Sequence, residues 1–200
     1  YRELLTHGVV PVSMGGDHTI VLPILRAVAA KHGPVGLVHV DAHTDINDTM
    51  FGEKVAHGTP FRRAVEEGLP DCDRVVQIGV RGTGYAADDF DWSRQQGFRV
   101  VQVEECWHRS LVPLMAEVVE RVGGGPVYLS FDIDGIDPSF APGTGTPEIA
   151  GLTVPQAVEI IRQRVNGLGV AEAEVSKQGN GADATIVVSI PGATQGDVVE

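Results

Sequence analysis

Short apolar runs alternate along this chain with longer segments in which apolar residues recur at helical spacing. A short run bounded by turn residues predicts a strand, and a helical period predicts a helix. The predicted strands are residues 9–14, 35–40, 75–80, 99–103 and 127–131, and the predicted helices are residues 19–32, 61–67, 111–122 and 154–165. Because the strands are apolar along their whole length, we expect a mainly parallel sheet with helices on both faces, a three-layer α/β/α fold.

Six side chains that can bind metals follow three of these predicted strands: His18, Asp41, His43, Asp45, Asp132 and Asp134. They belong to the stretches GGDH, VDAHTD and FDID. Alternate residues of an extended segment point the same way, so the side chains within each stretch are expected to converge. Ligands of open α/β sheets bind beyond the carboxyl ends of the strands, so we expect the three stretches to share one pocket.

Four carboxylates at close range repel one another unless cations neutralise them, and two divalent metals supply the balancing charge. Imidazole and carboxylate ligands without thiolate suit Mn²⁺ and are compatible with Zn²⁺, Co²⁺ or Fe²⁺. A pair of metals can lower the pKa of a shared water and make a hydroxide nucleophile at neutral pH. Each stretch alone could instead cap a turn, as we expect of Asp17, and His18 alone could be a buried, hydrogen-bonded histidine. The repetition at three strand ends favours the two-metal site.

The bulk composition narrows the class of protein. A chain of 200 residues suits one domain with a sizeable core, and we treat residues 1–200 as a single domain. The formal charge of −12 argues against nucleic-acid binding, which needs clustered Lys and Arg. No apolar stretch approaches the roughly 18 residues of a membrane span, so no membrane partner is expected. Cys72 and Cys106 lack a metal-ligand spacing and are interpreted as structural thiols.

Five stretches, taken in order, resemble the ureohydrolases, the family of arginases and agmatinases. They are MGGDHTI, VHVDAHTDIND, HGTPFRRAVEEG, QIGVRG and SFDIDGIDPSFAPGTGTPEIAGLT. Within the family they are most similar to the animal mitochondrial agmatinases, also described as guanidino acid hydrolases. The resemblance implies an arginase-like fold, two Mn²⁺ ions, and hydrolysis of agmatine or of a linear guanidino acid such as 4-guanidinobutanoate to urea and an amine. It also implies a homo-oligomer and a mitochondrial location, with the cytoplasm as the alternative.

The resemblance further implies which metal each ligand holds. His18 and Asp45 would bind one Mn²⁺, His43 and Asp134 would bind the other, and Asp41 and Asp132 would bridge the pair. Asp45 would also help to orient the attacking hydroxide.

On the substrate side, the resemblance makes His57 in HGTPF the group that passes a proton to the leaving amine. Expelling an amine requires an acid that titrates near neutrality, which independently suits a histidine; an exposed loop histidine is the alternative. Thr146 in GTGTPE is expected near the guanidinium, in turn formation, or in both roles, and Glu200 is expected to hold the guanidinium. Arg81 could face an anionic substrate tail, although a structural salt bridge is the favoured interpretation.

The chain departs from the family pattern near its carboxyl end. After the last predicted helix the family runs directly into a strand ending in a motif like DVVE, which matches here only at residues 197–200. Residues 171–196 are therefore interpreted as an atypical insert, either a surface excursion or a stretch foreign to the native protein. The chain is expected to lack the start and the end of the family's domain. An inactive homologue, or another binuclear-metal hydrolase such as a deacetylase or phosphatase, is the alternative function.

Overall fold

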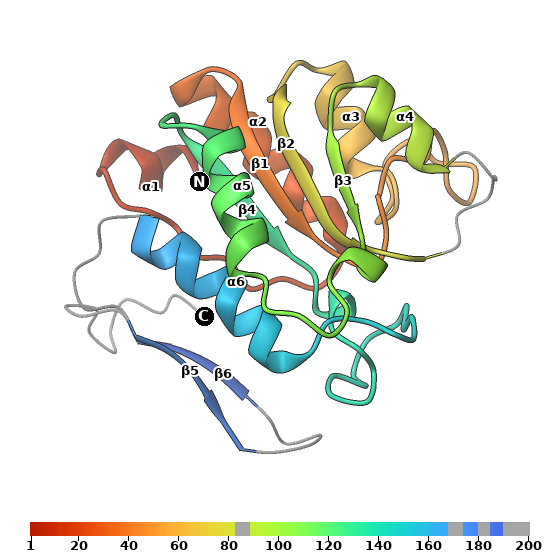
Figure 1. The fold of residues 1–200 in the computed structure, drawn as a ribbon. Helices are drawn as coiled ribbons and strands as arrows, with labels where there is room; N and C mark the ends of the chain where they lie inside the picture. Colours follow the sequence, from red (N-terminus) through yellow and green to blue (C-terminus); the bar gives the residue numbers. More distant parts are fainter. Residues whose placement is uncertain (83–88, 168–173, 180–184, 190–200) are drawn as a thin grey trace.

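A four-stranded parallel sheet forms the centre of the computed structural model (Figure 1). The structure describes residues 1–82, 89–167, 174–179 and 185–189. The strands are β1 (Val35–Val40), β2 (Pro70–Val80), β3 (Arg99–Gln102) and β4 (Val127–Phe131), and they lie in the order β3-β2-β1-β4. Both edges of β1 are paired and all of its residues are buried, so β1 is the central strand of the domain.

Helices cover both faces of this sheet (Figure 1). One face carries α2 (Val21–His32), α3 (Pro60–Glu66) and α4 (Asp89–Gln95), and the other carries α5 (Val112–Val122) and α6 (Val154–Gly167). Neighbouring residues of β1 divide between the two cores, because Leu37 packs with Phe61 of α3 whereas Val38 packs with Met115 of α5 and Ile160 of α6. The three-layer α/β/α prediction is confirmed. Among the described helices, none is long and apolar enough to cross a membrane.

Several shorter elements complete the described chain. They are α1 (Arg2–Thr6), the 3₁₀ turns η1 (His18–Ile20), η2 (Val103–Glu105) and η3 (Ile133–Gly135), and an antiparallel hairpin of β5 (Glu174–Gln178) and β6 (Thr185–Ser189). The hairpin lies beside α6 (Figure 1). Val175 of β5 packs against Ala157 and Val158 of α6. The described part of residues 171–196 thus shares a small apolar core with α6.

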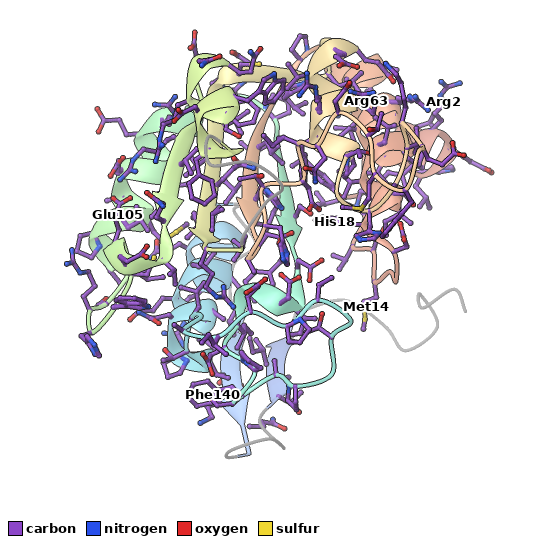
Figure 2. All side chains as sticks on the ribbon, turned by 90° about the vertical axis from the view of Figure 1, so that its right-hand side faces the viewer. Arg2, Met14, His18, Arg63, Glu105 and Phe140 are labelled. Carbon is purple, nitrogen blue, oxygen red and sulfur yellow. The ribbon has the colours of Figure 1, made fainter. Side chains whose placement is uncertain are left out.

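The observed elements match most of the predicted ones, and the structure adds α1 and the β5–β6 hairpin to them. Three further differences concern the main sheet and its helices. Residues 9–14 form no strand: Val12 is 79% exposed, and Met14 projects from the outside of the molecule (Figure 2). The prediction was wrong because an apolar run forms a strand only where it pairs, and residues 9–14 pair with none of the four strands of the sheet. Strand β2 begins at Pro70 rather than at residue 75, and α4 was missed because its few residues are too short to show a helical period.

Candidate metal centre

The carboxyl ends of β1 and β4 bring two aspartates side by side. Val40 of β1 pairs with Phe131 of β4 in parallel register, and the backbone N–H of Asp132 donates to the Val40 carbonyl at 2.8 Å. Asp41 and Asp132 directly follow this pair, so they leave the sheet at the same level. The register of two strands that are distant in sequence therefore begins the site at the edge where ligands of such sheets bind.

Tight turns, rather than continued strand, bring the second ligand of each pair back toward the first. Asp41 Oδ1 accepts the backbone N–H of His43 at 2.7 Å, and Asp132 Oδ1 accepts that of Asp134 at 3.0 Å. Such aspartate turns reverse the chain locally. Asp45 has a φ of 53°, in the left-handed region. The predicted convergence of these side chains is confirmed, but the extended backbone expected to cause it is not present.

His18 reaches the site from the start of α2, beside the carboxyl ends of the strands (Figure 2). It lies in η1, which Asp17 caps by accepting the Thr19 N–H through Oδ1 at 2.9 Å. The capping role predicted for Asp17 is confirmed, whereas the strand expected before His18 is absent. A helix start therefore supplies this candidate ligand, not a strand end.

The imidazole of His18 faces three carboxylates. Its Nδ1 lies 2.7 Å from Asp45 Oδ2, 3.3 Å from Asp41 Oδ2 and 3.6 Å from Asp132 Oδ2. Its other nitrogen, Nε2, lies 2.8 Å from the hydroxyl of Ser130 on β4. The Ser130 contact fixes the ring orientation and leaves Nδ1 directed at the carboxylates.

The imidazole of His43 faces a second set of carboxylates. Its Nδ1 lies 3.3 Å from Asp41 Oδ1 and 3.2 Å from Asp134 Oδ2. Asp134 is itself held in place, because its Oδ1 accepts the Ala42 N–H at 3.1 Å and its Oδ2 accepts the Thr146 hydroxyl at 2.8 Å. Thr146 thus contacts a candidate metal ligand, and its expected place near a guanidinium stays a prediction.

Asp41 is the member that both sets share. Its Oδ2 faces the group of His18 and Asp45, and its Oδ1 faces the group of His43 and Asp134. Within each group, one donor atom of every member lies within 4.8 Å of the others, as atoms around a common ion must. Asp132 adds an oxygen near His18, while its Oδ1 is bonded to the Asp134 N–H; its bridging of two ions therefore stays a prediction.

The site has an excess of negative charge that calls for cations. Burial raises the pKa of Asp45, and burial together with the neighbouring aspartates raises the pKa of Asp132. Burial lowers the pKa of His18 and of His43, but hydrogen bonds to the surrounding aspartates outweigh it and raise both pKa values to about 10. Without metals, protons on the two imidazoles supply positive charge to the carboxylates. The donor set, imidazole nitrogen and carboxylate oxygen without thiolate, therefore fits two divalent ions of the Mn²⁺ type.

A cavity of about 700 Å³ adjoins the two ligand groups and is lined by His57 and Thr146 as well as by the ligands. The side chain of His57 is 40% exposed, and its Nδ1 lies 4.0 Å from Asp17 Oδ2. A half-exposed imidazole beside the metal ligands is placed where it can exchange protons with both solvent and a bound molecule. Glu200, which is expected to hold the guanidinium, lies outside the described residues.

Arg81 anchors backbone segments and does not face the cavity as a substrate group. Its five N–H donors bond the carbonyls of Gly79, Asp134, Gly135, Glu148 and Ile149, at distances between 2.6 and 3.2 Å. No donor is left for an anionic substrate tail, so that alternative for Arg81 was wrong. The structural role was expected, but its partners are carbonyls rather than a salt-bridged carboxylate.

Three polar residues near the ligands were missed by the sequence reasoning. His39 is fully buried on β1 and lies 2.9 Å from Asp41 Oδ2, and Gln77 of β2 contacts His39 at 3.1 Å. Each interrupts an otherwise apolar buried strand, which was the available signal. Glu148 Oε1 lies 3.7 Å from His43 Nε2. Nothing in its local sequence marks that contact, because it joins residues far apart in the chain.

Comparison with known proteins shows the family of this chain. Residues 1–179 match the Arginase family. The chain belongs to the arginase family. One curated arginase-family relative, a guanidinobutyrase from Pseudomonas aeruginosa, is 72% identical over 178 residues, which cover 88% of this chain and 56% of the relative. Another, the mitochondrial agmatinase of Gallus gallus, is 66% identical over 162 residues, which cover 81% of this chain and 48% of the relative.

A solved structure of an amidinohydrolase agrees with the arginase-family fold. Proclavaminate amidinohydrolase from Streptomyces clavuligerus superposes with a TM-score of 0.71 at 44% identity, over 74% of this chain and 50% of that chain. The chain spans about half the length of the curated relatives that it matches. The resemblance to the arginase family predicted from the sequence motifs is confirmed, and so is the arginase-like fold.

Proposed function

We propose that the protein hydrolyses a linear guanidino compound to urea and the corresponding amine, with two Mn²⁺ ions as cofactors. The observation that carries this proposal is Asp41, whose two oxygens face two separate imidazole–carboxylate groups beside a cavity. When bound, a pair of metals supplies a water of lowered pKa and an electrophilic contact for the substrate. The choice of Mn²⁺ over other divalent ions rests on the oxygen-rich donor set and on the family.

The side chains around the cavity divide the remaining tasks. His57 would give a proton to the departing amine, because its imidazole lines the cavity and its 40% exposed side chain can take up a new proton from solvent. Asp45, whose carboxylate is buried beside His18, would accept a hydrogen bond from the attacking group and orient it. Thr146 and Glu200 would hold the guanidinium.

The preferred substrate would be a guanidino acid such as 4-guanidinobutanoate, with agmatine as the alternative. The guanidinobutyrase relative shares more identity with this chain than the agmatinase relative does, which favours the acid. Arg81 is not available to hold the acid's carboxylate, so another group must do so. We also propose, from the family, a homo-oligomer, and a mitochondrial location as in the name of the agmatinase relative, with the cytoplasm as the alternative.

Residues 1–200 would act as part of a single arginase-family domain. The family model matches residues 1–179, and one guanidinopropionase relative aligns over 97% of this chain, so the atypical character of residues 171–196 stays a prediction. Sequencing the transcript would test whether that stretch is native, since a transcript without it supports a foreign stretch and one that contains it contradicts this.

The direct test is the release of urea by the purified, Mn²⁺-loaded protein from 4-guanidinobutanoate, agmatine and arginine. Urea from 4-guanidinobutanoate with the highest kcat/KM of the three is the expected result. The matched control is Asp41→Asn, which keeps the size of the side chain but weakens the shared ligand and should abolish urea release. A protein that binds two Mn²⁺ yet releases no urea from any of the three would overturn the proposed activity and favour an inactive homologue or a different binuclear hydrolase.

A further inference from the structure

A series of hydrogen bonds connects Asp41 through His39 and Gln77 to the Thr44 carbonyl. His39 and Gln77 are directly opposite each other in the parallel register of β1 and β2, and both are fully buried. Gln77 Nε2 lies 3.1 Å from His39 Nδ1 and 2.8 Å from the Thr44 carbonyl, and His39 Nε2 lies 2.9 Å from Asp41 Oδ2. The buried parts of both strands are otherwise apolar, and a buried polar side chain costs free energy unless it is hydrogen-bonded.

The donor and the acceptor of each hydrogen bond in this series follow from the Thr44 carbonyl at its end. A carbonyl oxygen only accepts, so the group that Gln77 turns to Thr44 must be its amide nitrogen. That same nitrogen faces His39, whose Nδ1 must then accept and whose proton must sit on Nε2. His39 therefore donates from Nε2 to Asp41 Oδ2. The opposite amide orientation would set two oxygens 2.8 Å apart at Thr44.

The same assignment decides whether His39 is itself a metal ligand. Its Nε2 lies close enough to the group of His18, Asp41 and Asp45 to be counted with them on distance alone. A nitrogen that carries a proton has no lone pair to offer a metal. Gln77 thus keeps His39 out of the ligand set and makes it a hydrogen-bond donor to one ligand.

Packing prevents the His39 ring from adopting another arrangement. Its centroid lies 4.1 Å from that of Phe61 and 5.5 Å from that of His18, and the side chain has no exposed surface. Loss of a partner that holds a metal ligand in place typically costs about 10–100-fold in metal affinity. Here the partner holds one particular oxygen, the one that faces His18 and Asp45.

We propose that His39 is a positioning residue that directs Asp41 Oδ2 to the metal of the His18 group, while Oδ1, which accepts the His43 N–H, faces the metal of the His43 group. The proposal rests on the two-metal site proposed above. It predicts that loss of the His39 hydrogen bond lowers the affinity for one Mn²⁺ ion much more than the affinity for the other. A merely structural role would instead lower the stability of the fold and leave both affinities alike.

The test is a Mn²⁺ titration of the purified protein. Binding is monitored through the concentration of free Mn²⁺ and through the electron paramagnetic resonance signal of neighbouring Mn²⁺ ions. His39→Phe keeps a ring against Phe61 but removes the donor, and should weaken one of two Mn²⁺ ions by about 10–100-fold while two ions still bind at saturation. His39→Gln restores an amide N–H toward Asp41 and should recover most of the loss. Gln77→Leu keeps the imidazole and should lower the affinity for the same Mn²⁺ ion by a smaller factor. This variant keeps the test possible if His39→Phe fails to fold.

Gln156→Leu is the matched control for Gln77→Leu. Gln156 is another buried glutamine whose Nε2 donates to carbonyls, those of Cys106 and Arg109, neither of which is a candidate ligand. The Gln156→Leu substitution should lower the melting temperature without changing Mn²⁺ affinity. Wild-type affinity for both ions in His39→Phe and Gln77→Leu, or equal losses in His39→Phe and His39→Gln, overturns the proposal. Failure of the wild-type protein to bind Mn²⁺ would overturn the two-metal site itself, a distinct result.

Discussion

Replacing Arg81 by alanine should lower the free energy of unfolding of the protein without removing a contact with substrate. The guanidinium ties the end of β2 to three carbonyls of the following segments, those of Asp134, Glu148 and Ile149. A fourth acceptor, the Gly135 carbonyl, also receives the Leu152 N–H and loses less. At about 1 kcal/mol for each of the three bonds, the loss in the free energy of unfolding is about 3 kcal/mol, and more if the carbonyls stay dry.

Urea-induced unfolding of Arg81→Ala, Arg81→Lys and wild-type protein measures this cost. A lysine cannot reproduce the planar fork of donors, so Arg81→Lys should recover only part of the loss. Arg99→Ala serves as the control, because Arg99 pairs with Glu105 and Glu117 at the surface and its removal should cost about 1 kcal/mol or less. An Arg81→Ala protein with wild-type unfolding free energy but a raised KM for 4-guanidinobutanoate would refute the reasoning and restore the role of Arg81 at the substrate tail.

Three further predictions test the site itself. His57→Ala should keep both Mn²⁺ ions and lose kcat by about 10²–10⁴-fold, measured by urea release; loss of the metals would contradict its role. Gly82→Ala should weaken Mn²⁺ binding in a titration, because the added Cβ would lie 2.4 Å from His43 Cδ2, and unchanged affinity would contradict this contact. In chelator, the melting temperature should fall as the pH rises from 6.5 toward 10, because the pKa values of His18 and His43 are raised from 6.5 to about 10 by folding. A melting temperature that rises over this range would contradict the charge balance.

The strand VGLVHV and the residues after it show how much the sequence could predict. The apolar run gave β1 with its correct ends, and the spacing of Asp41, His43 and Asp45 indicated a metal site. The period of two was the wrong cause, because the aspartate turn at Asp41 and the left-handed backbone at Asp45 bring the side chains together. Local patterns name the ligand types reliably, but turn geometry decides how they meet.

Contacts between distant segments were beyond local patterns. The register of β1 with β4 places Asp132 beside Asp41, and only the folded sheet fixes that register. The origin of His18 in a helix start, and the binding of Arg81 to five carbonyls, likewise depend on how elements pack. For the same reason His39 and Gln77 read as irregularities in the sequence, although they adjoin each other and Asp41 in the fold.

The Mn²⁺ content of three proteins tests the central claim, a two-metal site that shares Asp41. Wild-type protein, Asp41→Ala and Asp45→Ala would be loaded with Mn²⁺, passed through a desalting column and analysed for metal per chain. The sharing of Asp41 predicts two ions in the wild type and loss of both in Asp41→Ala. Asp45→Ala should lose one ion, because Asp45 belongs to the His18 group alone. A single ion in the wild type, or two ions retained by Asp41→Ala, would contradict the shared site.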